Sequence, residues 1–446
     1  MVKIPIKTLC LVLCFVEAAF LLAAQAIGSM VLILPCLICF LALIVWASIQ
    51  NMAMPVCLFF LPFASLLKLG PDTLSFFTLA LLIVYAICAV RGHRNVSIAH
   101  MVPGLLLVIL TLIVKIAEGH AVTNEYVLFA ISLLAVPFLI TEIDAQRYDF
   151  YWVTMYFILG ILLAAFSSLL LSNFPSIARY INVVGEVTVS RRAGFTYDPN
   201  FYSAHITIAL SGVFVLLLNH VDKVKRIILI VTVVLLTYCG LLSVSKSFLL
   251  VSACVVFCWF FSFLFRKGRI SAKILTILTL LIVLVYILSS SVFSDLLDLM
   301  LLRMSDSTTL SDFTTHRTDL WGSYMRAFGA DPWLTLFGSG YSRVLVNDRA
   351  AHNTLIQAVF QFGLVGSICM AAWYVCLTRT LLTGSYRRRP DLAQTVILCI
   401  GCFGPWMGLD YLFCDETFLV PIYMCIAIRF LKQPPTPILA ESSVDE

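Results

Sequence analysis

The chain has 446 residues, of which 61% are hydrophobic and only 12% are charged, and its formal net charge is +5. An average soluble domain has about 25% charged residues, so this composition excludes an ordinary soluble protein and indicates an integral membrane protein. The small positive charge gives no reason to expect nucleic acid as a partner, because basic residues of a membrane protein sort by topology.

Long apolar runs predict the membrane-spanning elements in chain order. A helical span needs about 20 mostly apolar residues, and short strands of alternating polarity are absent, so a helical bundle is favoured over a barrel. We expect about fourteen helices, with a range of twelve to fourteen, because the second and third runs could hold a re-entrant piece. The runs fall near 8–27, 29–49, 52–68, 72–90, 100–118, 124–141, 150–172, 200–219, 226–242, 247–265, 274–293, 353–377, 392–412 and 416–431.

The short basic loops predict that both termini are cytoplasmic, since cytoplasmic loops carry an excess of Lys and Arg. Residues 1–432 then form a single transmembrane domain, 433–446 form a disordered cytoplasmic tail, and the segments 173–199 and 294–351 lie together on the outer face. Ala24-Gln25-Ala26 could be read as a signal-peptidase site, but an uncleaved first helix is preferred. The loops that fix this orientation contain Arg91 and Arg94, Arg147, Lys223 to Arg226, Arg266 to Lys273, Arg387 to Arg389, and Lys432.

Neither the cysteines nor the carboxylates predict a metal site or a cofactor. Of the fifteen cysteines, fourteen lie inside apolar runs and Cys414 lies between the last two, without a His or acidic cluster at ligand spacing. No Asp-x-Asp stands in the outer segments, so a metal-dependent pyrophosphate clamp of the usual acidic kind is not supported. A phosphorylated ligand on this face would have to be neutralised by cationic side chains.

The stretch from Arg191 to His205 interrupts two apolar runs with polar residues. Pro199 pushes Asp198 out of helical geometry, so Asp198 or Asn200 can cap the helix that begins near residue 200. Arg191 and its neighbour Arg192 gain nothing from the positive-inside rule on the outer face, and guanidinium forks suit phosphate oxygens. Binding of lipid headgroups is the alternative for them.

Two further ionisable residues mark the outer ends of helices. Lys246 lies in a tight hairpin with almost no loop around it, where snorkelling to the interface is the alternative to a functional role. His352 and Asn353 directly precede an apolar helix, whose N-terminus disfavours the imidazolium and favours a neutral ring that can accept a proton. A helix cap or an interfacial side chain is the alternative for His352.

The long outer segment 294–351 carries most of the remaining polar features. Arg317 and Trp321 are four residues apart, as on one face of an amphipathic helix. Gly338-Ser339-Gly340 predicts a turn, because it lacks the Lys-Ser/Thr of a phosphate-binding loop. Within the spans, Lys115 is expected to snorkel, and Glu17 needs a partner or a proton. The cations available for a phosphate are Arg191, Arg192, Lys246, Arg317, Arg326, Arg343 and Arg349.

These pieces occur in a recognisable order along about 180 residues: Arg191-x-x-Gly194 with Asp198-Pro199-Asn200, Ser243-x-Ser245-Lys246-Ser247, Arg317-x-x-x-Trp321, Gly338-x-Gly340, and His352-Asn353 with Gly363 and Gly366. The ordered set resembles the O-antigen polymerase and ligase superfamily of bacterial membrane glycosyltransferases. The first 150 residues match only as generic membrane helices.

This resemblance implies an all-helical, class C-like glycosyltransferase fold in the bacterial cytoplasmic membrane. It implies metal-independent transfer of a glycan from an undecaprenyl-pyrophosphate carrier on the outer face. Arg191, Lys246 and Arg317 would hold the pyrophosphate, and His352 would lie beside the acceptor as a candidate base. Lys246 departs from the Arg that the family usually has there. The expected catalytic residues are His352, Arg191 and Arg317, and the expected substrate-binding residues are Arg192, Lys246, Asp198, Asn200, Asn353 and Arg343.

The Gly-x-x-x-Asp-Pro-Asn element favours a polysaccharide polymerase, which joins the glycan of one lipid carrier to the repeat unit on another. A ligase that passes the finished chain to lipid A core or another acceptor is the alternative. A transporter of lipid-linked glycan is less favoured, because few charges lie inside the spans. Membrane lipids and a chain-length regulator are further candidate partners.

Overall fold

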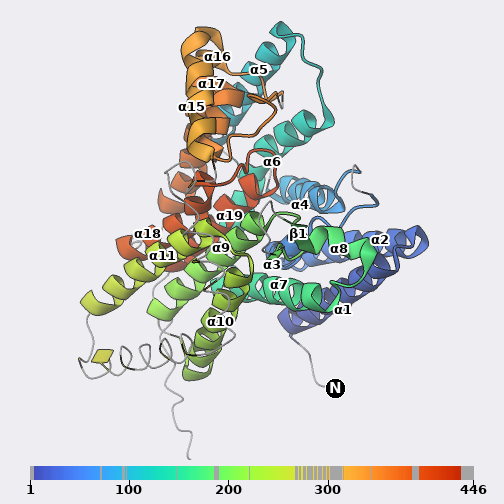
Figure 1. Ribbon diagram of the computed structural model, residues 1–446, viewed down its shortest axis with the longest axis vertical. Helices are drawn as coiled ribbons and strands as arrows, with labels where there is room; N and C mark the ends of the chain where they lie inside the picture. The colour runs from blue at the N-terminus through green and yellow to red at the C-terminus, as the bar shows by residue number, and fades with distance from the viewer. Residues whose placement is uncertain are drawn as a thin grey trace, which may run out of the picture.

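The computed structural model describes a bundle of helices over most of the chain (Figure 1). Arg343, the tail 433–446 and nearly all of the predicted helix near 274–293 lie outside the described residues. The described residues are 5–70, 73–92, 96, 98–146, 148–184, 190–219, 221–266, isolated positions between 270 and 301, 314, 316–342, 344–383 and 391–432.

Nine helices of this described part are long and apolar enough to cross a membrane. The chain is therefore a multi-pass membrane protein, as its composition predicted. These helices are α1 (Ile6–Ile27), α2 (Met30–Ile49), α5 (Ile98–Ala117), α6 (Asn124–Gln146), α7 (Phe150–Leu170), α9 (Pro199–Leu218), α10 (Lys223–Leu242), α11 (Lys246–Phe265) and α17 (Thr354–Thr383).

Four predicted runs form shorter helices: α3 (Ala53–Phe60), α4 (Phe76–Gly92), α18 (Leu392–Phe403) and α19 (Glu416–Lys432). Every residue of α3 is buried, and a 3-10 turn, η1 (Leu61–Phe63), follows it. Helix α3 packs against α7 inside the bundle, so it is an interior element of a length that suits a re-entrant piece better than a span.

The predicted helix over 392–412 is wrong in its second half. Helix α18 ends at Phe403, a 3-10 turn, η2 (Gly404–Met407), follows, and residues 408–415 form an irregular segment, the 408–415 loop. Pro405 lacks the backbone N–H that a continuing helix needs, and Gly404 and Gly408 are poor helix formers. The apolar character of the run concealed this break.

Helix α9 lies near the centre of the bundle, between α7, α10, α11 and α18 (Figure 1). Nearly all of its side chains are buried, including the polar Ser203, His205 and Thr207. A helix that is buried on all sides is a core element. It therefore fixes the position of the segment 191–200 at its N-terminus.

The segment 173–199, which the sequence predicts to lie on the outer face, contains more structure than expected. It forms a short helix, α8 (Pro175–Ile181), and an antiparallel hairpin of β1 (Asn182–Val184) and β2 (Ser190–Arg192). Val183 pairs with Arg191 in this hairpin. No strand was predicted, because three-residue strands are too short to show a period.

The outer segment 294–351 contains α15 (Arg317–Ala330) and α16 (Pro332–Phe337). Helix α15 begins at Arg317, so the predicted amphipathic helix is confirmed. Together with the N-terminal part of α17, these helices form a lobe at one end of the long axis, beside α5 (Figure 1). We call this part the outer lobe.

A close contact between backbones joins the outer lobe to a kink in α17. Gly363 interrupts α17 with φ 66° and ψ 179°, and Gly338 has φ 73°. A Cβ on Gly338 would lie 2.4 Å from the backbone nitrogen of Gly363, closer than any side chain allows. Ser339 N donates to the Phe360 carbonyl at 2.9 Å, which completes the junction. Gly338-Ser339-Gly340 is thus a structural turn, as predicted.

Candidate functional site

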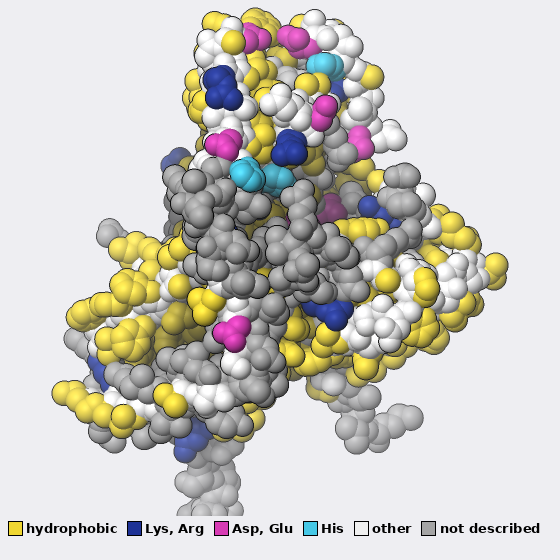
Figure 2. Space-filling model, in the orientation of Figure 1, with side chains coloured by type: hydrophobic (Ala, Val, Ile, Leu, Met, Phe, Trp, Pro, Cys, Tyr) yellow, Lys and Arg dark blue, Asp and Glu magenta, His cyan; other side chains and the backbone are white. Residues whose placement is uncertain are grey.

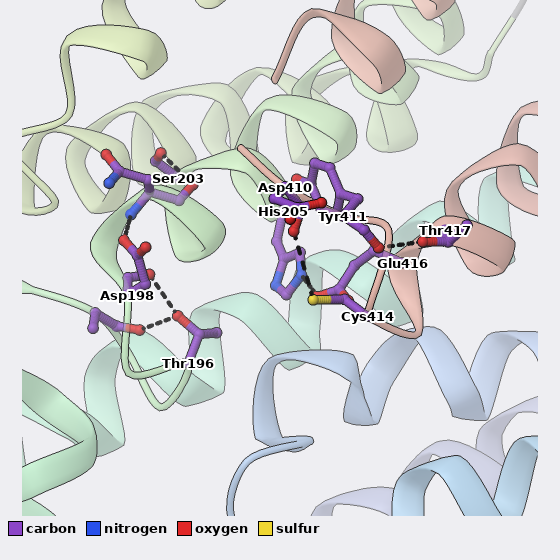
Figure 3. Close-up of polar contacts among 11 residues, drawn as sticks. Thr196, Asp198, Ser203, His205, Asp410, Tyr411, Cys414, Glu416 and Thr417 are labelled. Carbon is purple, nitrogen blue, oxygen red and sulfur yellow. Dashed lines mark hydrogen bonds and ion pairs between the residues drawn. The ribbon is translucent and has the colours of Figure 1, made fainter. Parts of the chain in front are cut away.

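The segment before α9 is held by its own polar side chains. Asp198 caps the helix, since its Oδ1 accepts a hydrogen bond from Asn200 N at 2.7 Å. The Thr196 hydroxyl donates to the Asp198 carbonyl at 2.8 Å (Figure 3). Gly194 supplies the predicted turn with φ 57°, and a Cβ there would lie 2.8 Å from the Tyr202 ring. The Asp-Pro-Asn element therefore acts first as a helix start.

Arg191 connects this helix start to the turn between α10 and α11. Its Nη2 donates to Asn200 Oδ1 at 3.0 Å, and its Nε donates to the Ser243 carbonyl at 3.2 Å. The Ser245 hydroxyl donates to the same Asn200 oxygen, also at 3.0 Å. Asn200 is thus a shared acceptor for two elements, and these bonds fix the direction of the guanidinium.

Arg192 follows Arg191 in strand β2 and pairs with Asn182 across the hairpin. Successive side chains of a strand point to opposite faces, so the two arginines cannot face the same ligand. The sequence grouped them because they are adjacent. The structure brings only Arg191 to Asn200.

Lys246 is the first residue of α11, and it is partly exposed. Ser245 caps this helix, so the tight hairpin predicted there is confirmed. The neighbouring Ser247 lies close to Gly408, because a Cβ on that glycine would be 3.5 Å from Ser247 Oγ. The start of α11 therefore adjoins the 408–415 loop.

Arg317, the first residue of α15, reaches the same loop from the outer lobe. Its Nη1 donates a hydrogen bond of 2.6 Å to the Gly408 carbonyl. Burial lowers the pKa of Arg317, and the nearby Asp198 carboxylate acts in the opposite direction. The side chain stays protonated in either case, because a guanidinium is hardly ever neutral in a protein. Arg317 thus faces both the loop and the α9 cap.

His352, at the end of segment 294–351, is within electrostatic reach of Arg317 and Arg349. Its side chain is exposed to solvent, but the protein around it still disfavours the charged form. This partial desolvation lowers the pKa of His352 below 6.5, and the charges of Arg317 and Arg349 lower it further, while Asp198 opposes them. The neutral form is favoured, as the sequence predicted, although for a different reason than the helix terminus. Figure 2 shows histidine side chains beside basic ones at the base of the outer lobe.

Asn353 has a structural role. Its side chain is 3% exposed, and its Oδ1 accepts hydrogen bonds from Leu355 N at 3.0 Å and Ile356 N at 3.2 Å. This caps α17 and holds His352 directly before the helix. Asn353 therefore orients its neighbour rather than facing the solvent.

The 408–415 loop holds these parts together, and the sequence did not single it out. The Thr354 hydroxyl donates to the Leu409 carbonyl at 2.8 Å and accepts from Tyr411 N at 3.1 Å. With the Arg317 bond to Gly408, the loop contacts the first residues of both α15 and α17. A glycine and two acidic residues within an apolar run were the signal that could have indicated it.

Charged groups also lie inside the bundle. His205 Nε2 and Glu416 Oε1 are 2.9 Å apart, and these residues are 1% and 9% exposed (Figure 3). Lys115 is 1% exposed and donates to the Tyr341 carbonyl at 3.2 Å, so the prediction that it snorkels is wrong. Glu17 is 8% exposed, and its Oε1 has no hydrogen-bond partner among the described residues.

In the described part of the chain, no three His, Cys, Asp or Glu side chains could together hold a metal ion.

Asp198, Arg317 and His352 therefore lie within electrostatic reach of one another, although they are far apart in the sequence, and Arg317 contacts the 408–415 loop. Arg191 is connected to this group through Asn200, whose backbone N–H bonds to Asp198. Lys246 begins the adjoining helix, Arg192 follows Arg191 in β2 and pairs with Asn182, and Arg343 lies outside the described residues. No protein-family model matches the chain, and no curated protein is similar to it in sequence. Fold and composition together define a multi-pass helical membrane protein with a polar site at one end of its bundle.

Proposed function

We propose that the chain is a glycosyltransferase that takes a glycan from a lipid-pyrophosphate carrier and elongates another lipid-linked repeat unit. The observation that carries this proposal is the approach of Arg317 and His352 to each other beside Asp198. A fixed cation and a neutral imidazole side by side are what such a transfer requires. The ordered motifs that resemble the O-antigen polymerase and ligase superfamily support the same reaction.

In the proposed reaction, an acceptor hydroxyl attacks the anomeric carbon of the donor sugar. The bond from that carbon to the pyrophosphate oxygen breaks, and the pyrophosphate leaves with the electron pair on its lipid. Arg191, Arg317 and Lys246 would stabilise the charge that develops on the leaving oxygens. His352 would accept the hydroxyl proton. Asp198, within electrostatic reach of both Arg317 and His352, would orient both.

The substrate site would lie on the outer face of the bacterial cytoplasmic membrane, with both termini inside. A cysteine introduced at His352 should react with a membrane-impermeant maleimide in intact spheroplasts, whereas one introduced at Lys223 should react only after lysis. The parent chain, which has fifteen cysteines, gives the baseline. Equal labelling of both positions from outside would contradict this orientation.

The decisive experiment uses lipid-linked oligosaccharides extracted from a source strain that lacks this chain. Purified protein should convert them into a ladder of longer glycans without another acceptor. Transfer that occurs only after lipid A core is added would identify a ligase instead. No new glycosidic bond with either acceptor would overturn the proposal.

Transport of a lipid-linked glycan is a second candidate, and one observation favours it. The expectation from sequence was that a transporter would place charges through the bundle interior, and Glu17, Lys115, His205 and Glu416 are buried there. Vesicles that contain the protein and a fluorescent lipid-linked oligosaccharide distinguish the two. Movement of the label between leaflets without chain growth would support transport.

A further inference from the structure

The 408–415 loop ends where two consecutive carboxyl groups diverge into the bundle. Glu416 contacts His205 on α9 at 2.9 Å (Figure 3). Asp415 turns to α4, where its Oδ2 accepts a hydrogen bond of 3.0 Å from the Thr78 hydroxyl. The two acids thus bind different helices. We call His205, Asp415 and Glu416 the acid–imidazole cluster.

The polar groups around this cluster are not all satisfied. Nδ1 of His205 and the hydroxyl oxygens of Tyr85 and Tyr411 are buried without a hydrogen-bond partner among the described residues. These three residues are 1%, 1% and 0% exposed. Tyr85 is within electrostatic reach of Asp415, and Tyr411 is within reach of Glu416. An unpaired buried polar group is destabilising, so a bound water or a change of protonation that supplies a hydrogen-bond partner is favoured there.

The charges of the cluster do not balance when all three groups ionise. Two carboxylates and one imidazolium leave a net charge of −1, and the first compensating cation is Lys68, beside Asp415. Burial, and then the neighbouring Glu416, raise the pKa of Asp415 to about 7. The other titratable groups that face the cluster are Cys57 from α3, Tyr85 and Cys88 from α4, Tyr411 and Cys414 from the loop, Cys402 from α18, and Asp198 before α9.

We propose that the acid–imidazole cluster is a proton-binding site inside the membrane domain, at which Asp415 exchanges one proton with the medium. Glu416 and His205 remain paired with each other while Asp415 gains or loses that proton. The same loop carries the Gly408 carbonyl that holds Arg317, so the charge of the cluster lies next to the proposed glycan site. The inference does not require glycan transfer, and its test contains no glycan.

Infrared spectroscopy of the full-length protein in nanodiscs tests it, because a protonated carboxyl has its own C=O band. The measurement uses a Glu17→Gln background, which removes the buried carboxyl that lies outside the cluster. We expect a carboxyl band at about pH 5 that fades as pH rises through neutrality to about pH 9, together with release of one proton. Asp415→Asn should abolish this titrating band.

Glu118→Gln is the matched control, because Glu118 is an exposed carboxyl at the end of α5. Its removal should leave the band unchanged. Glu416→Gln should shift the titration of Asp415 to lower pH, since one repelling charge is gone. If Asp415→Asn does not fold, the shift of the titration in Glu416→Gln assigns the band to Asp415 instead. A band that is absent at every pH, or one that Asp415→Asn does not change, would overturn the proposal.

Discussion

Arg317 donates a hydrogen bond of 2.6 Å to the carbonyl of Gly408, which lies 91 residues further along the chain. The bond joins the first residue of α15 to the irregular loop that follows η2. It is the contact through which the outer lobe and the bundle share a polar site. Gly408 permits it because a glycine leaves room for the guanidinium.

Gly408→Ala should displace that guanidinium without unfolding the chain. Its φ of −126° suits any residue, but a Cβ would lie 2.9 Å from Arg317 Nη1. The far end of a flexible side chain can move aside, so we expect normal thermal stability and at least ~10-fold slower glycan transfer. Gly329→Ala, on α15 with nothing within 4 Å, is the control and should behave like the parent. Equal rates for the two variants would show that the bond to Gly408 is dispensable.

Arg191→Lys should impair transfer although it keeps the charge. A single ammonium cannot reproduce the fork that reaches both Asn200 Oδ1 and the Ser243 carbonyl. We expect a ~10- to ~100-fold loss of kcat/KM, measured by ladder formation. Arg192→Lys, the same change on the opposite face of the hairpin, should cost less than ~3-fold. Similar losses in both would contradict the separation of the two side chains by the strand.

The pH profile of transfer should depend on His352. Partial burial and the Arg317 charge lower its pKa below 6.5, so the neutral base persists to more acidic pH than a free imidazole. The rate should therefore rise with pH and reach half its maximum below pH 6.5. Arg349→Gln removes a positive charge that lowers the pKa of His352, so the acidic limb of the pH profile should move to higher pH.

His352→Gln is the complementary test of the same role. It should remove the acidic limb and slow transfer by about 10²-fold. An acidic limb that persists in this variant would assign the proton transfer to another group.

The junction between Gly338 and Gly363 should dominate the stability of the outer lobe. Gly338→Ala combines a positive φ of 73° with a Cβ only 2.4 Å from a backbone nitrogen. Gly119→Ala has nearly the same φ, 69°, but nothing within 4 Å. We expect about 1 kcal/mol of destabilisation for the second and several for the first. Thermal unfolding in detergent measures the difference, and equal melting temperatures would mean that the contact is loose.

The sequence predicted the class of fold because hydrophobic spans leave a strong and local signal. It also predicted an amphipathic helix with Arg317 and Trp321 on one face, a cap at Asp198 or Asn200, and the neutral bias of His352. The predicted helix over 392–412 was wrong in its second half, because an apolar composition there accompanies an irregular backbone. Periodicity cannot distinguish a short interior helix such as α3 from a span.

The contacts of the site depend on tertiary structure and could not be predicted from spacing. Adjacent in the sequence, Arg191 and Arg192 appear equivalent. In the structure they are successive residues of strand β2, whose side chains alternate between opposite faces. His205 and Glu416 are 211 residues apart, so no local pattern indicates that they pair. Asn353 looked like a ligand-facing residue because caps and binding sites use the same side chains.

The break in α17 at Gly363 has a consequence for how the protein tolerates different lipids. The half of α17 after the break carries exposed apolar side chains such as Ile368, which suit contact with acyl chains. The half before the break is fastened to the outer lobe and to residue 409. A thicker or thinner bilayer changes the preferred tilt of a spanning helix. We therefore expect the half of α17 after Gly363 to adjust its tilt at this break, while Thr354 and the histidine before it keep their positions.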